Sequence, residues 1–412
     1  MDDLTRRNVL RAGGAALAGL AVMRIAGPAQ AFPGNQEDET VIDWVDQPAP
    51  LPPGVEEGVG HPLIWERLQD RIIPANEFFT VKHYGEPPID AAAWRVDVRG
   101  LVARPQSWSL ADLRARNRRE VEFTLECSGN TGLPFFIGGV GNAAWGGTSL
   151  AEVLRRARPL PQATEVVFWG ADSGPVDVPG GWNLPSPERP DSPGPGGTIS
   201  GTEYFARSMS IADAMAPDNL LCYEMNGQDL TPEHGAPVRL IAPGWYGVAN
   251  VKWLNGIEVV DQRFAGRFMA REYVTIREEE RDGQTVWTFA TVGHARLKSA
   301  PARVTRRGDQ YMITGVAWGA PIEHVEVRID GGPWTAAVVT ETEADGDALR
   351  AGYTWTFWTF DWGRPAVGEH TVECRAFDTD GNVQPAPDDP FLTSKLTYWE
   401  SNGWITRRVN IT

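Results

Sequence analysis

Residues 121–135, VEFTLECSGNTGLPF, place a single cysteine directly after a predicted buried strand. Apolar Val121, Phe123 and Leu125 alternate with polar residues, which is the period-two pattern of a strand. The Ser-Gly-Asn-Thr-Gly sequence that follows predicts a tight turn. Because reactive groups are often held on loops at strand ends, Cys127 is a candidate functional thiol. A free cysteine is also often a small buried apolar residue, and this stretch alone leaves both interpretations open.

The region around this stretch, residues 61–290, mixes short strand and helix patterns and is interpreted as an α+β domain. Strands are predicted at 94–98, 165–169, 238–242 and 251–260, and helices at 110–116 and 150–157. Ser109 and Ser149 precede the two helices as N-cap residues. The Gly- and Pro-rich residues 180–201 are predicted to form a long surface loop of the kind that often borders a site.

Residues 291–412 have a different character, because short runs of β-branched and aromatic residues alternate there with tight-turn signals. Asp330-Gly331-Gly332 and Asp380-Gly381 are the clearest turns. The predicted strands lie at 311–318, 324–329, 334–339, 353–362 and 370–377. Regularly spaced strands of this kind favour an immunoglobulin-like β-sandwich.

A second chemically informative stretch, residues 222–254, brings His234, Arg239 and Lys252 close together around predicted strands and glycine turns. Cationic and hydrogen-bonding side chains beside free backbone amides suit a phosphate attached to a polar heterocycle. The residues leave a structural alternative open, in which His234 bonds the local backbone and the two cations lie on solvated surfaces.

Several motifs occur in order along the chain, and the first of them contains Cys127. They are Cys-Ser-Gly-Asn (127–130), Tyr-Glu-Met-Asn-Gly (223–227), His-Gly-x-Pro-Val-Arg (234–239), Pro-Gly-Trp-x-Gly (243–247) and Val-Lys-Trp-Leu (251–254). This set resembles the sulfite oxidase family of molybdenum enzymes, and the similarity extends from about residue 74 to the C-terminus. The resemblance implies a molybdopterin-binding domain followed by an immunoglobulin-like dimerisation domain, and therefore a homodimer.

The resemblance also implies roles for individual residues. Cys127 matches the protein ligand of molybdenum, with the other sulfur donors supplied by the dithiolene of molybdopterin, and a thiolate suits such a metal. Tyr273 matches the tyrosine beside the metal and is the second predicted catalytic residue. The implied cofactor-binding residues are Phe79, Thr80, Val81, Lys82, His83, Asp172, His234, Arg239, Asn250, Val251 and Lys252.

The activity that the resemblance implies is oxidation of sulfite, or a related small sulfur compound, to sulfate by oxygen-atom transfer. The cofactor would perform this two-electron chemistry while the protein supplies a ligand, orientation and an electrostatic field. The sequence contains no CxxCH motif, so we expect no haem in this chain. Electrons would therefore pass to a separate acceptor, for which a basic cytochrome c is the candidate.

The sequence departs from the family where sulfite oxidases carry substrate-binding arginines. Val81 and Gly132 occupy two of these positions, and the C-terminal region offers only Lys395. Arginines bind oxyanions through paired hydrogen bonds, so their loss puts the substrate in question. Other cations could replace them, namely Lys82, Lys395, Arg189 or Arg207. The alternatives are a sulfur-oxide reductase, an oxidase of a less charged substrate, or a noncatalytic protein that has lost its cofactor.

The N-terminal residues predict export. Arg6-Arg7 precede a weakly apolar run that ends in Ala29-Gln30-Ala31, the pattern of a twin-arginine signal peptide over residues 1–31. We therefore expect a periplasmic protein with no membrane span in its mature chain. Residues 32–60 contain seven acidic residues, no lysine or arginine, and several prolines. They predict an extended arm or linker, with ordered structure beginning near His61.

The charge of the chain bears on its partners. Without residues 1–31, 34 basic and 52 acidic residues remain, a net charge of −18. This excess argues against nucleic acid, whose phosphates attract basic proteins, and is compatible with a basic protein partner. The three cysteines, Cys127, Cys222 and Cys374, are an odd number scattered along the chain, which argues against a disulfide framework.

Overall fold

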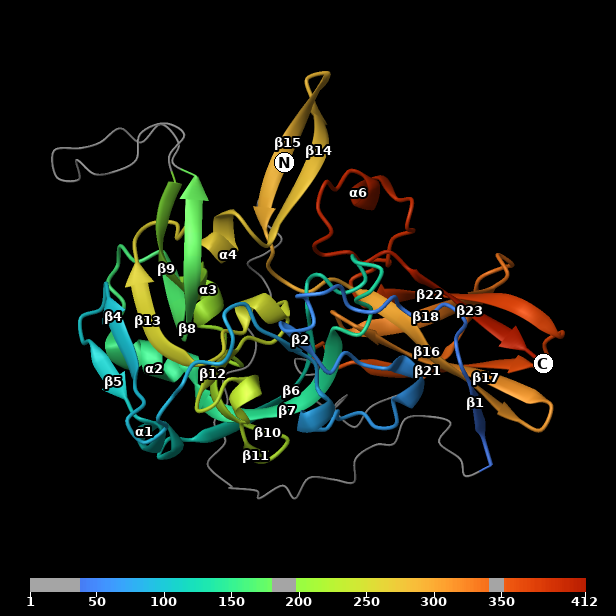
Figure 1. Ribbon diagram of the computed structural model, residues 1–412, viewed down its shortest axis with the longest axis horizontal. Coiled ribbons are helices and arrows are strands. Elements are labelled where there is room, and N and C mark those ends of the chain that lie inside the picture. Colours follow the sequence, from blue (N-terminus) through green and yellow to red (C-terminus); the bar gives the residue numbers. More distant parts are fainter. Residues whose placement is uncertain (1–37, 180–197, 341–351) are drawn as a thin grey trace, which may run out of the picture. The chain divides into compact units, whose positions relative to one another are not determined.

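The computed structural model describes residues 38–179, 198–340 and 352–412. The predicted signal peptide, residues 1–31, lies outside these ranges. Strands dominate, and the helices are few and short (Figure 1). No helix in the described ranges is both long enough and apolar enough to cross a lipid bilayer. The fold is the predicted α+β domain followed by a β-sandwich.

The first sheet of the catalytic domain contains the strand that precedes Cys127. Its strands run in the order β11-β10-β7-β6, with β12 also paired to β10, and all its pairs are antiparallel. The bounds are β6 (Arg118–Glu126), β7 (Val140–Ser149), β10 (Leu220–Met225), β11 (Gln228–Asp229) and β12 (Arg239–Ile241). Because β6 ends at Glu126, Cys127 is the first residue after a strand, as predicted.

The second sheet has the order β5-β4-β13-β8-β9, in which β4 and β13 are parallel and the other pairs antiparallel. The bounds are β4 (Val96–Gly100), β5 (Gln106–Trp108), β8 (Glu165–Pro179), β9 (Thr198–Ser210) and β13 (Leu254–Val260). The register of β8 against β9 shifts between Trp169 and Ser173, which takes Asp172 out of the regular ladder. Such irregularities re-aim a side chain.

The predicted loop at 180–201 is wrong at its end. Residues 198–201 belong to β9, where Thr198 pairs with Pro179 and Gly201 with Val176. The rest of that prediction, residues 180–197, lies outside the described residues. The strand forms despite the glycine because the partner strand β8 supplies a continuous ladder of backbone hydrogen bonds.

The helices cover the two sheets (Figure 1). The side chain of Ser109 accepts a hydrogen bond from Asp112 N at 3.1 Å, and that of Ser149 accepts one from Glu152 N at 3.4 Å, so both predicted N-caps are confirmed. The α-helices here are α1 (Leu110–Arg114), α2 (Leu150–Ala157), α3 (Ile211–Ala214) and α4 (Arg267–Ala270). The 3₁₀ helices are η1 (Trp65–Arg67), η2 (Ala75–Glu77), η3 (Pro232–His234) and η4 (Gly247–Ala249).

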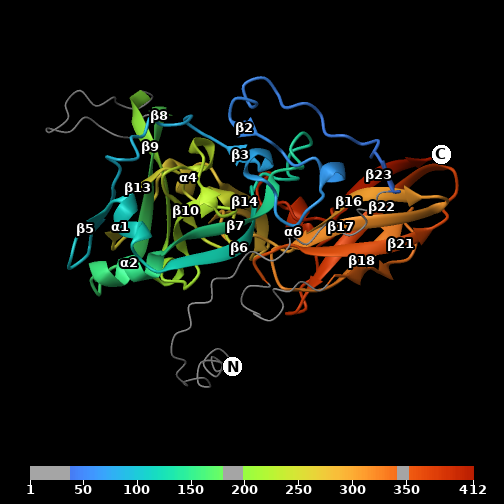
Figure 2. The same ribbon diagram turned by 90° about the horizontal axis from the view of Figure 1, so that it is seen from below.

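The C-terminal strands form the predicted sandwich (Figure 2). Its sheets have the orders β1-β16-β17-β21-β20 and β19-β18-β22-β23. The bounds are β1 (Thr40–Ile42), β16 (Lys298–Arg307), β17 (Gln310–Trp318), β18 (Ile322–Ile329), β19 (Thr335–Ala336), β20 (Val338–Val339), β21 (Thr356–Gly363), β22 (Gly368–Asp378) and β23 (Ile405–Ile411). Buried residues of both sheets, including Val325 and Trp358, pack into one core cluster.

The arm before His61 is more ordered than we expected. Strand β1 pairs with β16, and the side chain of Trp44 is buried, with its Nε1 donating to Ala302 O at 2.9 Å. Strand β2 (Val59–Gly60) pairs with β3 (Thr80–Val81). The expectation that order begins near His61 is therefore wrong, because a β-branched run and a tryptophan join the arm to the sandwich.

Two further elements lie between and after the main sheets. Strands β14 (Val274–Arg281) and β15 (Gln284–Thr291) form a two-stranded hairpin that stands beside α6 (Pro390–Thr393) in Figure 1. One core cluster spans both halves of the described chain, since Phe123 and Trp145 of the catalytic domain belong to it together with Trp318 and Trp355. Fully burying such a side chain contributes roughly 1.5–3 kcal/mol.

Candidate functional site

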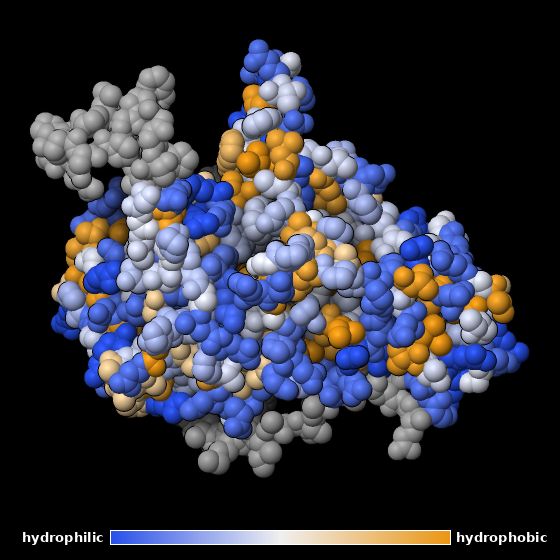
Figure 3. All heavy atoms as spheres, viewed as in Figure 1, coloured by the Kyte–Doolittle hydropathy of each residue, from blue (hydrophilic) through white to orange (hydrophobic). Residues whose placement is uncertain are grey.

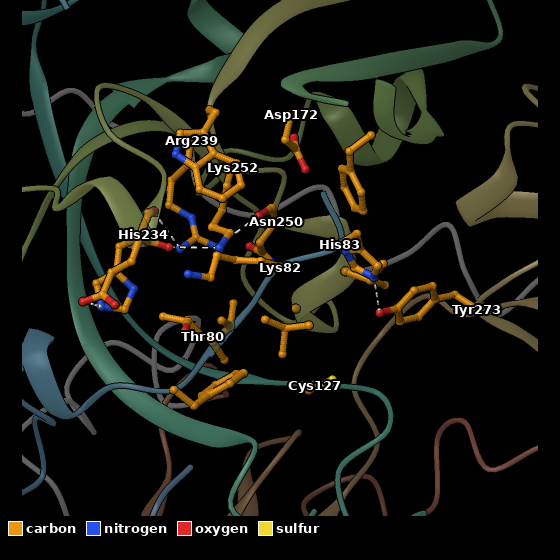
Figure 4. A pocket seen from close by; sticks show the side chains of 18 residues that line it. Thr80, Lys82, His83, Cys127, Asp172, His234, Arg239, Asn250, Lys252 and Tyr273 are labelled. Atoms are coloured by element: carbon orange, nitrogen blue, oxygen red, sulfur yellow. Dashed lines mark hydrogen bonds and ion pairs between the residues drawn. The ribbon is translucent and has the colours of Figure 1, made fainter. Parts of the chain in front are cut away.

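A pocket lies where β6 ends, and it collects twelve of the thirteen predicted site residues (Figure 4). Its empty volume is about 640 Å³. The predicted residues that line it are Phe79, Thr80, Val81, Lys82, His83, Cys127, Asp172, His234, Arg239, Asn250, Lys252 and Tyr273. Residues from six separate parts of the chain therefore meet in one cavity.

Cys127 is held by backbone hydrogen bonds on both sides of its side chain. Its N–H donates to Gly139 O at 2.8 Å, and its carbonyl accepts from Asn130 N at 2.9 Å. Burial raises the pKa of the Cys127 thiol to about 11, so the proton stays on in the absence of a cation. A bound metal ion would remove that proton. Cys222 and Cys374, by contrast, are fully buried core residues that do not line the pocket.

Cations gather at one end of the pocket, away from Tyr273 (Figure 4). The guanidinium of Arg239 donates to His234 O at 3.1 Å and to Asn250 O at 3.0 Å. The Lys252 ammonium donates to Glu233 O at 2.9 Å. Burial, aided by the nearby Arg239 charge, lowers the pKa of Lys252 to about 7. Two cations desolvated side by side are stabilised by an anion between them.

His234 lines the cavity with a neutral imidazole ring. Its Nε2 donates to Ala75 O at 2.7 Å, and burial lowers the pKa of the ring to about 4. The neutral ring therefore keeps a lone pair on Nδ1. Gly235, with φ +97°, follows it, and a Cβ added there would lie 2.8 Å from the Cβ of Lys252. Only glycine permits this turn and this close approach together.

At the opposite end, His83 and Tyr273 form a hydrogen-bonded pair (Figure 4). His83 Nε2 and Tyr273 Oη are 2.8 Å apart. Burial lowers the pKa of His83 to about 4, and burial raises the pKa of Tyr273 well above its usual range. The pair is therefore an imidazole and a phenol, both neutral at pH 7. The ring of Tyr273 stacks on Trp399, with the centroids 4.2 Å apart.

Two of the predicted site residues, Val251 and Asn250, differ from the others in how their side chains are used. Val251 does not line the pocket, because its side chain is buried in the core while its carbonyl accepts from Leu240 N at 2.8 Å. Asn250 lines the pocket, but its amide serves the backbone: Oδ1 accepts from Ala242 N at 2.7 Å and Nδ2 donates to Tyr246 O at 3.1 Å. Asn250 thus fixes the turn that carries Lys252.

Sequence reasoning missed six residues of the pocket wall, Leu125, Phe205, Glu233, Gly247, Val248 and Trp253. Leu125 could have been found, because it lies two residues before Cys127 and so on the same side of the chain. Gly247 ends the Pro-Gly-Trp-x-Gly motif and lies close to Cys127. Phe205, on β9, had no signal in the sequence.

The structure shows what surrounds a position where the family's arginine is missing, and where two of the candidate replacement cations lie. A Cβ added to Gly132 would lie 2.1 Å from Tyr398 O, so the C-terminal segment fills the space of a side chain there. Lys395 does not line the pocket, and its Nζ donates to Trp399 O at 2.9 Å. Arg207 is buried and its guanidinium donates to two carbonyls, those of Phe268 and Val292.

Lys82 is the remaining candidate for a replacement cation within the described ranges. It lines the pocket and pairs with Glu86, with the two charged atoms 2.9 Å apart. Arg189, the fourth candidate, lies outside the described residues.

Comparisons with known proteins agree with this arrangement. Residues 83–268 match the family described as "Oxidoreductase molybdopterin binding domain", and residues 293–411 match "Mo-co oxidoreductase dimerisation domain". Sulfite oxidase of Gallus gallus is 31% identical over 348 residues, covering 78% of this chain and 70% of that protein. The chain belongs to the sulfite oxidase family. It is a molybdopterin-dependent oxidoreductase.

Other relatives show how widely this family's architecture extends. Mitochondrial sulfite oxidase of Rattus norvegicus is 32% identical over 367 residues, covering 82% of this chain and 62% of that protein. Nitrate reductase [NADH] 1 of Arabidopsis thaliana is 27% identical over 377 residues, covering 82% of this chain but 38% of that protein. The solved sulfane dehydrogenase SoxCD from Paracoccus pantotrophus shares the fold, with a TM-score of 0.69, 22% identity, and coverage of 91% and 90%.

The pocket fits the cofactor of the sulfite oxidase family. Asp172 Oδ1 and Arg239 Nε are buried and have no hydrogen-bond partner among the described residues. Buried polar atoms are normally paired, so these two call for a polar ligand. Burial also raises the pKa of Asp172 to about 6, a shift that hydrogen bonds donated to its carboxylate would reverse. A soft thiolate donor, an acceptor carboxylate and paired cations are what a metal-bearing phosphorylated pterin requires.

Proposed function

We propose that this protein oxidises a small sulfur compound, sulfite or a relative of it, with its molybdenum–molybdopterin cofactor held by Cys127. The observation that carries the proposal is the convergence of the free thiol, Asp172 and the two cations Arg239 and Lys252 in one pocket. When bound, the cofactor supplies oxygen-atom transfer and a two-electron change. The protein's residues supply the metal ligand, the orientation of the bound groups and the electrostatic field.

Each of these residues has a distinct task. Arg239 and Lys252 would bind the phosphate, and Asp172 and the neutral His234 ring would accept hydrogen bonds from pterin N–H groups. The buried His83–Tyr273 pair orients the substrate. One member donates the hydrogen bond within the pair, and the other member still has an N–H or O–H group that can donate to the substrate. The apolar walls, such as Phe79 and Phe205, limit the access of water.

A second candidate function, oxidation of a less charged sulfur compound, is favoured by the pocket's lining. Val81 lies in the wall, and Arg239, at the cofactor end, is the one arginine among the described lining residues. A dianion therefore has few partners beyond Lys82. The reverse reaction, reduction of a sulfur oxide, would use the same less charged wall.

The test is rapid mixing of the purified oxidised enzyme with sulfite, or with neutral sulfur compounds, while the spectrum of the molybdenum centre is recorded. Reduction by sulfite supports sulfite oxidation. Reduction by a neutral compound but not by sulfite favours the second candidate. If the enzyme, first reduced chemically, is reoxidised by sulfur oxides, the protein is a reductase.

We further propose that the electrons leave to a separate protein, a basic cytochrome c. The acidic chain, with a net charge of −16, would attract such a partner over several ångströms. Substrate-dependent reduction of cytochrome c should therefore slow as the ionic strength rises. A rate that is the same at low and high ionic strength would contradict this acceptor.

Export and dimerisation complete the proposal. The Arg6-Arg7 pair and Ala29-Gln30-Ala31 support twin-arginine export to the periplasm, after the cofactor has been inserted. The match of residues 293–411 to a dimerisation domain supports a homodimer. Replacing both arginines by lysine should retain the protein in the cytoplasm, which cell fractionation tests.

A further inference from the structure

The β14–β15 hairpin exposes two large aromatic side chains. Trp287 is 61% exposed and Phe289 is 65% exposed. Because they are two residues apart on a strand, both lie on the same face of the hairpin. Large apolar groups gathered on a surface and rimmed by polar residues are typical of a binding surface.

The apolar face extends beyond the hairpin. Phe289 is the cross-strand partner of Ile276, and Leu396 N donates to Ile276 O at 2.9 Å from the other side. Leu396 is itself exposed. Figure 3 shows hydrophobic colour along the lower part of the hairpin. We name Ile276, Trp287, Phe289 and Leu396 the hairpin patch.

Carboxylates border the hairpin patch. Glu278 is the cross-strand partner of Trp287, and Glu280 follows two residues further along the same face. Both are exposed. The arginines of β14, Arg277 and Arg281, alternate with these glutamates and so belong to the opposite face. The patch therefore has an apolar centre with an acidic rim.

The hairpin patch is connected to the catalytic pocket by contacting rings. Tyr273, which lines the pocket, immediately precedes β14 and stacks on Trp399 at 4.2 Å between centroids. Trp399 in turn contacts Tyr398, with the centroids 4.1 Å apart, and Tyr398 is exposed two residues after Leu396. Tyr398 also borders the Cys127 turn, because a Cβ on Gly129 would lie 3.4 Å from its ring.

We propose that the hairpin patch is the docking surface for the separate electron acceptor, a small basic haem protein. This inference rests on the proposed function, in which the metal is held by Cys127 and its electrons leave to a separate protein. Interface centres are enriched in aromatic anchors such as tryptophan, and charged rims set orientation and the rate of encounter. The acidic rim selects an acceptor whose exposed haem edge is ringed by lysines.

The electron count fixes how the surface is used. Oxidation of one sulfite with one water gives sulfate, two protons and two electrons. A haem protein accepts one electron as its ferric iron becomes ferrous, so two acceptor molecules dock in succession for each turnover. The protons pass to solvent. A surface that is visited twice per turnover must release its partner quickly, which suits a small patch.

A second copy of this chain is the competing occupant. Ile276, Trp287 and Phe289 lie outside residues 293–411, the range that matches the dimerisation domain, and only Leu396 of the hairpin patch lies inside it. A two-fold contact through this face would also bring Glu278 and Glu280 near their own counterparts, and like charges oppose such a contact. The acidic rim therefore favours a partner of opposite charge over a copy of the same chain.

The test compares the holoenzyme with its Trp287→Ser/Phe289→Ser variant, using two acceptors. Mitochondrial cytochrome c is the basic protein probe, and ferricyanide is a small acceptor that needs no docking surface. Val367→Ser is the matched control, since Val367 is 80% exposed on the sandwich. We expect the double variant to lose about tenfold or more in kcat/KM for cytochrome c, with an unchanged rate with ferricyanide. Glu278→Gln/Glu280→Gln should weaken the dependence of the cytochrome c rate on salt.

The outcomes are separable. An unchanged cytochrome c rate in the double variant, with turnover to ferricyanide intact, overturns the docking surface and leaves the proposed function standing. A wild-type enzyme that reduces neither acceptor, whether sulfite or a neutral sulfur compound is the reducing substrate, overturns the proposed function. A double variant that light scattering shows to be monomeric, while the wild type is dimeric, assigns the patch to the second copy and also overturns the proposal. Equal molybdenum content in all variants confirms that they folded around the cofactor.

Discussion

The ammonium of Lys298 lies 2.6 Å from the carboxylate of Glu126, and both side chains are almost completely buried, at 1% and 0% exposed. Glu126 immediately precedes Cys127, whereas Lys298 begins β16 of the sandwich. Trp318 Nε1, also from the sandwich, donates to the other carboxylate oxygen at 2.9 Å. A buried charged network therefore ties the C-terminal domain to the turn that carries the metal ligand.

Replacing Lys298 by methionine should destabilise the fold strongly. The change leaves the Glu126 carboxylate buried without its counter-ion, which typically costs about 3–5 kcal/mol in the free energy of unfolding. Chemical denaturation would measure it. Glu126→Gln/Lys298→Met, which removes both charges, should recover much of the loss. Arg408→Met, which breaks an exposed ion pair with Glu369, should cost less than about 1 kcal/mol, and a Lys298→Met effect as small as that would contradict this account.

Placing a cation at Val81 should improve the use of sulfite. Val81 lines the pocket, and an arginine there would supply paired hydrogen bonds for an oxyanion. We expect Val81→Arg to raise kcat/KM for sulfite by about tenfold, equivalent to roughly 1.4 kcal/mol. Steady-state kinetics with sulfite and with a neutral sulfur compound would measure it. Val338→Arg, at an exposed site in the sandwich, is the control. An equal gain for both substrates would contradict a charge effect.

Cofactor retention should depend on pH through Lys252. Burial and the nearby Arg239 lower the pKa of Lys252 to about 7, and a bound phosphate would raise it again. Between these two pKa values of Lys252, the protein with bound cofactor carries more protons than the cofactor-free protein. The affinity for the cofactor is therefore highest below pH 7 and falls as the pH rises above 7. The fluorescence of released pterin, recorded at a series of pH values, would measure how much cofactor is lost. Lys252→Arg should remove the dependence, and an unaltered dependence in that variant would exclude Lys252 as its source.

Removing the hydroxyl of Tyr273 should slow turnover without unfolding the protein. Tyr273→Phe loses the 2.8 Å hydrogen bond to His83 and one hydrogen bond for orienting the substrate, while the ring can still stack on Trp399. We expect a loss of about 10- to 100-fold in kcat/KM. Tyr204→Phe, at an exposed position, should match the wild type. Equal activity of the two variants would remove Tyr273 from the site's chemistry.

The sequence predicted the local parts of this site well. The strand before Cys127, the two serine caps and the grouping of His234, Arg239 and Lys252 depend on short-range patterns, and the structure has them. The family resemblance supplied the more distant positions, such as Asp172. Val251, another of these positions, has its side chain buried in the core and does not line the pocket, and spacing alone does not fix which way one side chain points.

Other features depend on contacts between distant residues, which no local pattern encodes. Lys298 is 172 residues from Glu126, and neither its burial nor its partner can be read from its neighbours. The stacking of Trp399 on Tyr273 likewise joins residues that are far apart in the sequence. Strand β1 likewise joins the sandwich although its sequence context is that of an acidic linker.

The central claim is that the sulfur of Cys127 binds the molybdenum, and one measurement tests it most directly. The spectrum of the oxidised enzyme is recorded after a single rapid addition of its reducing substrate, for the wild type, Cys127→Ser and the control Cys222→Ser. The account predicts that Cys127→Ser retains the pterin but shows no reduction of the metal centre, while Cys222→Ser is reduced like the wild type. Reduction of Cys127→Ser at the wild-type rate would contradict it.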